Sequence, residues 1–273
     1  MSSLAESRFH PAGGAFDSIA EEYDRIFTNS AIGRAQRDAV WEVARCAFSR
    51  GSHILELNCG TGEDALFLSR LGMKVYACDA SENMITVARR RQLREAPHSA
   101  VQFNVLASEN LATLENLLQF DGVFSNFGGL NCVTDLADLG RRLASLLRPG
   151  GVAVLSLCSR VCLWEIAWFL CHAQGRRAFR RVKGRATAAL NGLKVQVQYP
   201  TVRDLRAAMH PWFTLRKVKS IGLAVPPTYL EQWASRHRNA LGFTSAIDRV
   251  ASEWPLLRTL GDHVLLVMER TLA

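Results

Sequence analysis

The chain has 273 residues, of which 48% are hydrophobic, and a formal net charge of +8. This size and composition suit one large α/β domain and argue against wholesale disorder. The seven cysteines include no Cys-x-x-Cys pair and no zinc-like Cys/His spacing, so we expect no disulfide framework and no structural metal. We see no secretory signal, and the longest apolar stretch, 161–171, is shorter than the roughly 20 residues of a membrane span. We therefore expect a cytoplasmic protein.

In chain order, residues 1–15 are predicted to be a mobile arm and residues 16–48 to be helical. Short apolar strands and amphipathic helices then alternate, which predicts right-handed βαβ units and a parallel sheet. The expected strands are 53–58, 74–78, 101–105, 121–126 and 151–157. The expected helices between them are 62–71, 82–95, 110–118 and 135–147.

After residue 158 the alternation changes. Residues 161–185 read as one helix with an apolar start and a basic end, because six of the ten residues from 176 to 185 are cationic. Residues 194–200 alternate like a strand, and a helix over 201–209 begins at a Thr201 cap. A strand over 213–223, a helical region to about 260 and a last strand over 263–270 complete the prediction.

One glycine-rich turn carries the strongest functional signal. In ILELNCGTGED (54–64) a buried strand runs into a turn and a helix start, and Gly60 and Gly62 allow a ligand to approach the backbone. Such turns also occur in dinucleotide-binding proteins. Glu56, however, would repel a pyrophosphate and suits an ammonium group. Asp79, at the end of the next strand, is placed to accept hydrogen bonds from both hydroxyls of a ribose.

Five segments together resemble the class I S-adenosylmethionine-dependent methyltransferases, and specifically their bacterial small-molecule branch. They are FDSIAEEYD (16–24), ILELNCGTGEDA (54–65), VYACDASENMITVAR (75–89), FDGVFSNFGGLN (120–131) and LLRPGG (146–151). The resemblance covers 16–157 well and 158–273 only by strand order. It implies a Rossmann-like, doubly wound, mostly parallel seven-stranded sheet with an antiparallel last strand, plus a helical lid or insertion.

The same resemblance implies one methyltransferase domain over 16–273. Its parts are a helical cap (16–48), a cofactor-binding core (49–157), acceptor-side elements (158–262) and the last strand (263–273). The implied cofactor is S-adenosylmethionine, with S-adenosylhomocysteine as product. The implied cofactor-binding residues are Tyr23, Glu56, Asn58, Gly60, Gly62, Asp79, Ala80, Met84, Ala107, Ser108, Asn126 and Phe127.

Within this set, the residues at the turn would hold the methionine moiety, Asp79 the ribose and Met84 the adenine. Asn126 and Phe127 would lie under the sulfonium, and Tyr23 would close over the cofactor. Simple packing is the alternative for Met84 and Tyr23.

Two positions depart from the family pattern. Asn58 replaces the usual first glycine and either donates to the cofactor carboxylate or only shapes the turn. Ala107 replaces the usual aspartate that meets the adenine amine, so Ser108 or the backbone would take over.

The acceptor side is less defined. SNFG stands where adenine and glutamine methyltransferases carry DPPY or NPPF, and Ser125 and Asn126 stand where a catechol-type metal ligand would begin, so we expect no Mg²⁺ requirement. A general base is optional for methyl transfer, and His210, Tyr23 and Tyr229 are weak candidates. His263 is expected to be structural. The acceptor candidates are Asn131, Trp164, Glu165, Trp168 and Tyr229, and each has packing as its alternative.

These observations favour transfer of a methyl group to oxygen, nitrogen or carbon of a small metabolite. An RNA or protein acceptor is the second hypothesis, suggested by the net charge, although no nucleic-acid module is visible. A non-methylating use of the cofactor, such as cyclisation, is the third. The 161–185 segment is expected to cap the active site; peripheral contact with an anionic membrane is its alternative.

Overall fold

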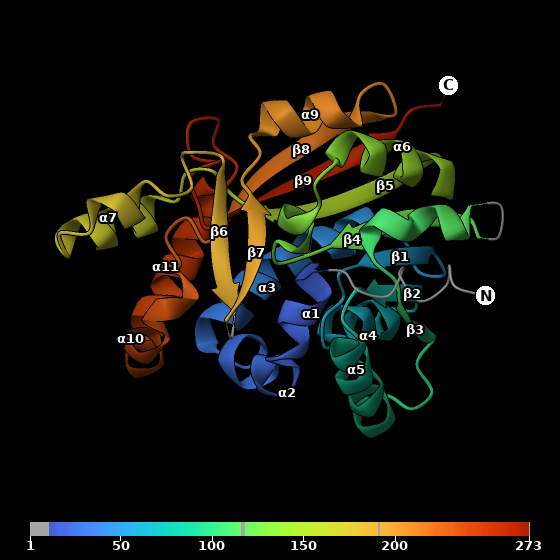
Figure 1. The fold of residues 1–273 in the computed structure, drawn as a ribbon, viewed down its shortest axis with the longest axis horizontal. Helices are drawn as coiled ribbons and strands as arrows, with labels where there is room; N and C mark the ends of the chain where they lie inside the picture. The colour runs from blue at the N-terminus through green and yellow to red at the C-terminus, as the bar shows by residue number, and fades with distance from the viewer. Residues whose placement is uncertain (1–10, 116–117, 191, 273) are drawn as a thin grey trace.

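In a computed structural model, which describes residues 11–115, 118–190 and 192–272, the chain forms a seven-stranded sheet covered by helices (Figure 1). The strand order is β3-β2-β1-β4-β5-β9-β8. The strands are β1 (His53–Leu57), β2 (Lys74–Asp79), β3 (Val101–Val105), β4 (Phe120–Ser125), β5 (Leu147–Cys158), β8 (Phe213–Ile221) and β9 (His263–Arg270). β1 to β5 pair in parallel, whereas β9 lies antiparallel between β5 and β8. The predicted fold class is therefore confirmed.

Each face of the sheet has its own hydrophobic core. On one face α3 (Ala31–Ala47), α4 (Glu63–Arg70) and α5 (Glu82–Glu95) bury side chains such as Val40, Leu66 and Ile85. On the other face α6 (Leu136–Leu146), α9 (Val202–Met209) and the 3₁₀ helix η3 (Ser108–Leu114) do the same. Residues 110–118 were predicted to be an α-helix, so η3 corrects that prediction. The capping box at Thr201 confirms the predicted start of α9.

The N-terminal segment packs over the carboxyl ends of β1 and β2. It consists of α1 (Pro11–Asp17), α2 (Ala20–Tyr23) and a π-helical turn, η2 (Asp24–Thr28). Residues 1–10 of the predicted arm lie outside the described residues. Residues 11–15 belong to α1 instead, because Ala15 is fully buried and Asp17 accepts hydrogen bonds from Ser81 and Asn83.

The predicted helix over 161–185 is wrong. The chain forms α7 (Leu163–Cys171), reverses, and continues through α8 (Gly175–Ala178) into a two-stranded hairpin of β6 (Arg185–Leu190) and β7 (Leu193–Gln198). The helix ends at Cys171 because Ala173 adopts a left-handed conformation with φ 56°. Two arginines of the segment that was predicted to be one helix, Arg180 and Arg181, turn back and form ion pairs with the buried Glu165.

The remaining elements close the molecule. They are η4 (Gly129–Cys132), η5 (Thr228–Leu230), α10 (Glu231–Arg236) and α11 (Arg238–Ala251).

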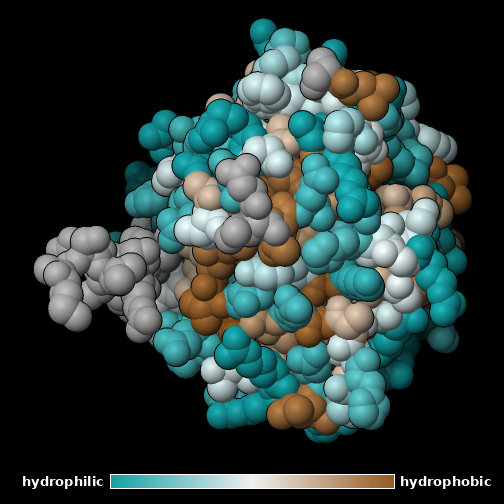
Figure 2. All heavy atoms as spheres, turned by 90° about the vertical axis from the view of Figure 1, so that its right-hand side faces the viewer, coloured by the Kyte–Doolittle hydropathy of each residue, from teal (hydrophilic) through white to brown (hydrophobic). Residues whose placement is uncertain are grey.

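The face at the right-hand side of Figure 1 is mostly hydrophilic, with hydrophobic side chains showing between polar ones near its middle (Figure 2). Among the described helices, none is both long enough and apolar enough to cross a bilayer.

Candidate active site

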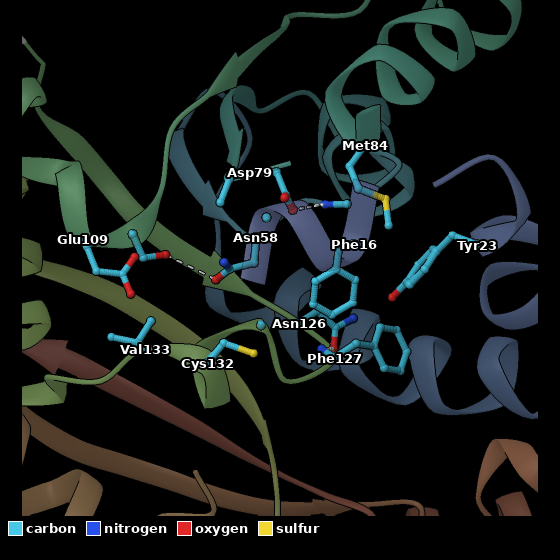
Figure 3. A pocket seen from close by; sticks show the side chains of 15 residues that line it. Phe16, Tyr23, Asn58, Asp79, Met84, Glu109, Asn126, Phe127, Cys132 and Val133 are labelled. Carbon is cyan, nitrogen blue, oxygen red and sulfur yellow. Dashed lines mark hydrogen bonds between the residues drawn. The ribbon is translucent and has the colours of Figure 1, made fainter. Parts of the chain in front are cut away.

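A cavity opens at the carboxyl ends of β1, β2 and β4, the edge where open α/β sheets bind ligands (Figure 3). Nine of the predicted cofactor-binding residues line it, namely Tyr23, Asn58, Gly60, Asp79, Ala80, Met84, Ser108, Asn126 and Phe127. Six further residues complete the lining, namely Gly13, Phe16, Glu109, Gly129, Cys132 and Val133. Gly62, Ala107 and Glu56, also predicted, lie behind this surface. We call this space the first cavity.

The glycine turn is held in an unusual backbone conformation. Asn58, Gly60 and Gly62 all have positive φ, at 55°, 53° and 80°. At Gly62 a side chain would also collide with Phe103, whereas at Gly60 the space is open. The open space at Gly60 leaves the backbone of the turn accessible to a ligand.

The carboxylate of Asp79 is fixed by this turn. One oxygen accepts from the backbone N–H of Gly60 at 2.9 Å and the other from that of Ser81 at 2.9 Å. Asp79 is therefore held at the wall of the first cavity in one orientation.

Glu56 lies beneath the turn with only 1% of its surface exposed. Its Oε2 atom has no hydrogen-bond partner within the described part of the chain. Burial, reinforced by the nearby charge of Asp64, raises the pKa of this carboxyl well above its usual range. A buried carboxylate oxygen without a hydrogen-bond partner is costly, so Oε2 of Glu56 is a candidate contact for a polar group of a ligand.

The N-terminal helices cover the first cavity from the opposite side. Phe16 and Tyr23 face it, with the hydroxyl end of Tyr23 directed inward (Figure 3). Burial raises the pKa of Tyr23 to about 12, so its hydroxyl stays protonated at neutral pH. The cover is tied down by Arg91, which is buried and forms ion pairs with Asp24 of the cover and Glu63 of α4.

A buried polar network supports the floor at the end of β4. The carboxylate of Asp64 accepts from Arg37 at 2.5 Å, from Trp41 at 2.6 Å and from the amide of Asn126 at 3.3 Å. The Arg37 guanidinium lies 4.6 Å from the centre of the Phe127 ring. Asn126 and Phe127 thus cannot move independently of the helix that carries Arg37.

A second cavity of about 290 Å³ adjoins the first. Both are lined by Phe16, Tyr23 and Phe127. Its other lining residues are Ile19, Phe27, Gly33, Gln36, Arg37, Cys158, Arg181, Leu190, Thr228, Asp262 and His263. Most of the exposed surface inside it is apolar, and its polar lining residues include Cys158 at the end of β5 and His263 at the start of β9. Of all its lining residues, only Tyr23 and Phe127 were predicted to take part in the site.

The residues predicted to contact the acceptor do not line either cavity. The Asn131 amide donates to the carbonyls of Cys158 and Gln198 and accepts from the N–H of Cys158, so it holds β5 against β7. Glu165 is 1% exposed and pairs with two arginines. Both side chains therefore serve the packing of the fold.

The aromatic and histidine candidates are also placed elsewhere. The Trp164 indole donates to the carbonyl of Ala224, and Trp168 packs on Tyr229. Tyr229 is 45% exposed on η5. His210 is exposed at the C-terminal end of α9, away from both cavities. Instead His263, which was expected to be structural, lines the second cavity.

The comparisons with known proteins agree with this geometry. Residues 54–151 match the family model of a methyltransferase domain. The chain is 31% identical over 141 residues to a demethylmenaquinone methyltransferase of Leptospira interrogans. The aligned region covers 50% of this chain and 56% of the relative. The chain thus spans about half the length of the curated relatives it matches.

Residues 54–151 are thus similar to a methyltransferase domain. Solved structures extend the likeness in fold over the rest of the chain. A complex of DhpI with SAH superimposes with a TM-score of 0.61 at 18% identity, covering 99% of this chain and 98% of the other. A putative S-adenosylmethionine-dependent methyltransferase from Listeria monocytogenes gives a TM-score of 0.58 at 17% identity, covering 85% and 96%. The segment that matches the methyltransferase domain model contains the glycine turn, Asp79 and the floor of the first cavity.

Proposed function

We propose that this protein transfers a methyl group from S-adenosylmethionine, bound in the first cavity, to a small and largely apolar molecule bound in the second. The observation that carries the proposal is the shared wall. Phe16, Tyr23 and Phe127 line both cavities, so two ligands would meet at these three side chains. Residues 16–273, together with residues 11–15 of α1, would act as one methyltransferase domain.

The residues of the first cavity fit the cofactor in charge and shape. The unpartnered carboxyl of Glu56 would receive the methionyl ammonium group, directly or through water. Asp79, which the backbone N–H groups of Gly60 and Ser81 hold at the cavity wall, would hold the ribose hydroxyls. Met84 and Ser108 would contact the adenine, with Asn58 beside the turn, in keeping with the predicted set. When bound, S-adenosylmethionine would supply a methyl group already activated by its sulfonium charge.

The chain itself would position the two ligands and exclude water from the space between them. Phe16 and Tyr23 would exclude water from above, and Phe127 would fix the boundary at which the acceptor stops. Holding two reactants at a set distance in a closed site provides much of the rate of a bimolecular displacement. The apolar walls of the second cavity, Ile19, Phe27 and Leu190 among them, would select a small apolar acceptor over a polymer.

Two further proposals concern the setting. We propose a cytoplasmic location, because all seven cysteines are free, which is usual in a reducing compartment. We also propose that no metal takes part. Among the described residues no group of three or more acidic, histidine or cysteine side chains is arranged to hold an ion.

Calorimetry with S-adenosylhomocysteine tests the cofactor half of the proposal, and we expect binding at micromolar concentration or tighter. Incubation with labelled S-adenosylmethionine and a panel of small apolar hydroxyl, amine and enol compounds tests the second half. Appearance of S-adenosylhomocysteine together with a methylated compound is the expected result. Cofactor binding with release of methylthioadenosine would replace the proposal with a non-methylating reaction.

A peripheral contact with an anionic membrane is a second proposal for the 161–185 segment. Three apolar side chains there are about half exposed, Leu170 at 49%, Phe179 at 48% and Val182 at 46%, and Arg176 and Arg177 are exposed beside them. Such a pairing of apolar and cationic groups is typical of interfacial segments. Co-sedimentation with phosphatidylglycerol vesicles, but not with phosphatidylcholine vesicles, is expected at low salt. Absence of binding to both would reject this contact.

A further inference from the structure

Two reactive side chains face each other where β5 ends and β9 begins. Cys158 is the last residue of β5 and His263 the first of β9, and the two are direct partners in the antiparallel ladder. Side chains at such positions have their β-carbons about 4.5–5.5 Å apart. The thiol of Cys158 and the imidazole of His263 are accordingly within hydrogen-bonding reach.

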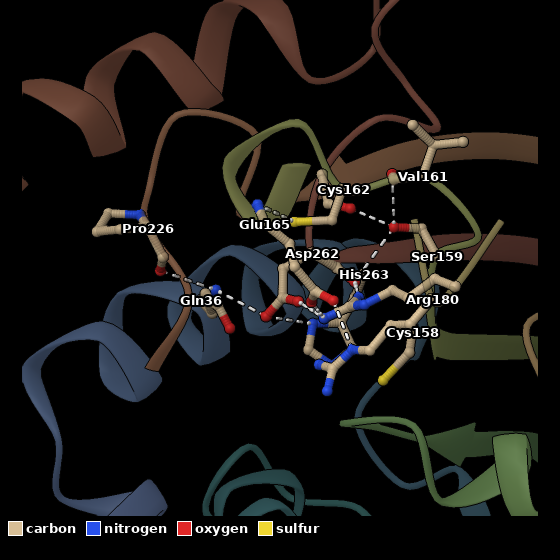
Figure 4. Close-up of polar contacts among 12 residues, drawn as sticks. Gln36, Cys158, Ser159, Val161, Cys162, Glu165, Arg180, Pro226, Asp262 and His263 are labelled. Carbon is tan, nitrogen blue, oxygen red and sulfur yellow. Dashed lines mark hydrogen bonds and ion pairs between the residues drawn. The ribbon is translucent and has the colours of Figure 1, made fainter. Parts of the chain in front are cut away.

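A carboxylate lies close to the imidazole. The Nδ1 atom of His263 is 3.5 Å from a carboxylate oxygen of Asp262, a distance that suits an ion pair with a protonated imidazole, although no hydrogen bond joins the two. That carboxylate receives a hydrogen bond of 2.9 Å from Arg181 and a longer one from Gln36 (Figure 4). Its negative charge beside the ring favours an imidazolium next to the thiol.

This cluster opens on the second cavity at its boundary with the first. Cys158, Asp262 and His263 all line the second cavity. The His263 ring meets the edge of Phe127, with ring centres 5.6 Å apart, and Phe127 lines both cavities. A molecule in the second cavity would therefore contact the thiol and imidazole close to the point where it meets the methyl donor.

The charges around the pair favour its ionised form. Burial by itself would raise the pKa of Cys158, but His263 and Arg181 outweigh burial and lower it. Burial by itself would lower the pKa of His263, but Cys158 and Asp262 outweigh burial and raise it. Other titratable and charged groups also face the pair. Glu165 acts on it indirectly, by its ion pair with Arg181. Cys162 and Tyr199 lie on the same side as Arg181, and Arg37 lies across the cavity.

We propose that Cys158 and His263 form the proton-accepting pair of the acceptor site, and that the acceptor is a molecule with a weakly acidic hydroxyl, such as a phenol or an enol. This inference rests on the proposed methyl transfer and names its substrate class. An amine acceptor needs no buried base, whereas a hydroxyl must lose its proton to become a strong nucleophile.

The proton balance is simple. In the resting pair Cys158 would be the thiolate and His263 the imidazolium. The acceptor O–H bond would break as its proton passes to the thiolate, and bound S-adenosylmethionine would supply the methyl group to the oxygen anion as its methyl carbon–sulfur bond breaks. The protonated pair then releases one proton to solvent, so the reaction yields one methylated product, one S-adenosylhomocysteine and one proton.

Thiol alkylation tests the pair without an acceptor or the cofactor. Iodoacetamide forms a carbon–sulfur bond with a thiolate and releases iodide, so its rate follows the thiolate fraction. The intact 273-residue protein would be alkylated between pH 5.5 and 9.5, and the modification of each cysteine followed by peptide mass spectrometry. We expect Cys158 to react with a midpoint at least about one unit below the usual value near 8.5, whereas the exposed Cys171 provides the internal reference.

The variant His263→Asn should raise the Cys158 midpoint to or above the usual value, because it removes the imidazolium. His172→Asn is the matched control, since His172 is an exposed histidine that contacts Trp168 and lies outside both cavities; it should leave the midpoint unchanged. A Cys158 midpoint at or above 8.5 in the wild type, or no modification of Cys158 while Cys171 reacts, would overturn the inference. S-adenosylhomocysteine binding, measured on the same samples, reports separately on the proposed function.

Discussion

The carboxylate of Asp79 accepts a hydrogen bond from the backbone N–H of Gly60 at 2.9 Å. This contact joins the end of β2 to the turn after β1, so the two segments form one wall of the first cavity. Asp79 is at once part of the wall and the proposed ligand of the ribose. A substitution at such a residue can change the wall, the ligand contact or both.

Asp79→Asn should weaken S-adenosylhomocysteine binding about 10- to 100-fold. The substitution keeps the shape but removes the charge, and a hydrogen bond to a charged group contributes about 1.5–3 kcal/mol. Calorimetry measures the change. Asp138→Asn, which alters an exposed carboxylate on α6, should bind like the wild type. Equal affinity in both variants would contradict the ribose assignment.

Glu56→Gln should stabilise the ligand-free protein at neutral pH and weaken cofactor binding. Because burial raises the pKa of Glu56 in the folded state, the carboxyl favours folding while it is protonated. That contribution is complete below the unfolded pKa of about 4.3 and is lost as pH rises through the folded value. Glutamine carries no charge, so thermal unfolding should occur at a higher temperature than in the wild type near pH 7.

The two proteins should unfold at more similar temperatures near pH 4, where Glu56 is neutral. Titration with S-adenosylmethionine should show the opposite order, with the wild type binding more tightly at pH 7. Loss of both stability and affinity would instead mean that Glu56 has a structural partner.

Arg91→Ala should loosen the N-terminal cover. Arg91 is 5% exposed and pairs with Asp24 and Glu63, and breaking a buried pair costs about 3–5 kcal/mol. We expect faster proteolysis within residues 11–28 and weaker S-adenosylhomocysteine binding. The neighbouring Arg90→Ala is the control, because Arg90 is 64% exposed and its pair with Glu21 contributes at most about 1 kcal/mol.

Asn131→Ala should destabilise the fold without changing cofactor affinity. Its amide makes three hydrogen bonds, two with Cys158 of β5 and one with Gln198 of β7. Each buried group left unpaired costs about 1–3 kcal/mol. Urea unfolding should show a loss of about 2–4 kcal/mol. The exposed Gln232→Ala should show almost none. A large drop in affinity for S-adenosylhomocysteine at unchanged stability would restore Asn131 as a ligand residue.

The cofactor side could be read from the sequence because its residues are local. Glu56, Gly60 and Gly62 lie within one strand and turn, and Asp79 ends the next strand, so parallel pairing of β1 with β2 brings them to one edge. Strand periodicity and glycine spacing therefore predicted the parallel sheet and the ligand-binding turn, whereas the family resemblance supplied the complete fold class and the other residues of the first cavity. Phe16 lies in the segment FDSIAEEYD (16–24) together with Tyr23, so it could also have been predicted to line the first cavity.

The acceptor side was decided by tertiary structure. Cys158 and His263 are 105 positions apart. The family resemblance implied an antiparallel last strand, but nothing in the local sequence pairs these two residues. The helix predicted over 161–185 fails for a similar reason. Its apolar and cationic pattern suits a helix, but Glu165 is buried where only Arg180 and Arg181 can neutralise it, and the chain must turn back to bring them there. Short-range patterns determined where the methyl donor would bind, whereas pairing between distant strands and buried charges decided what the acceptor would meet.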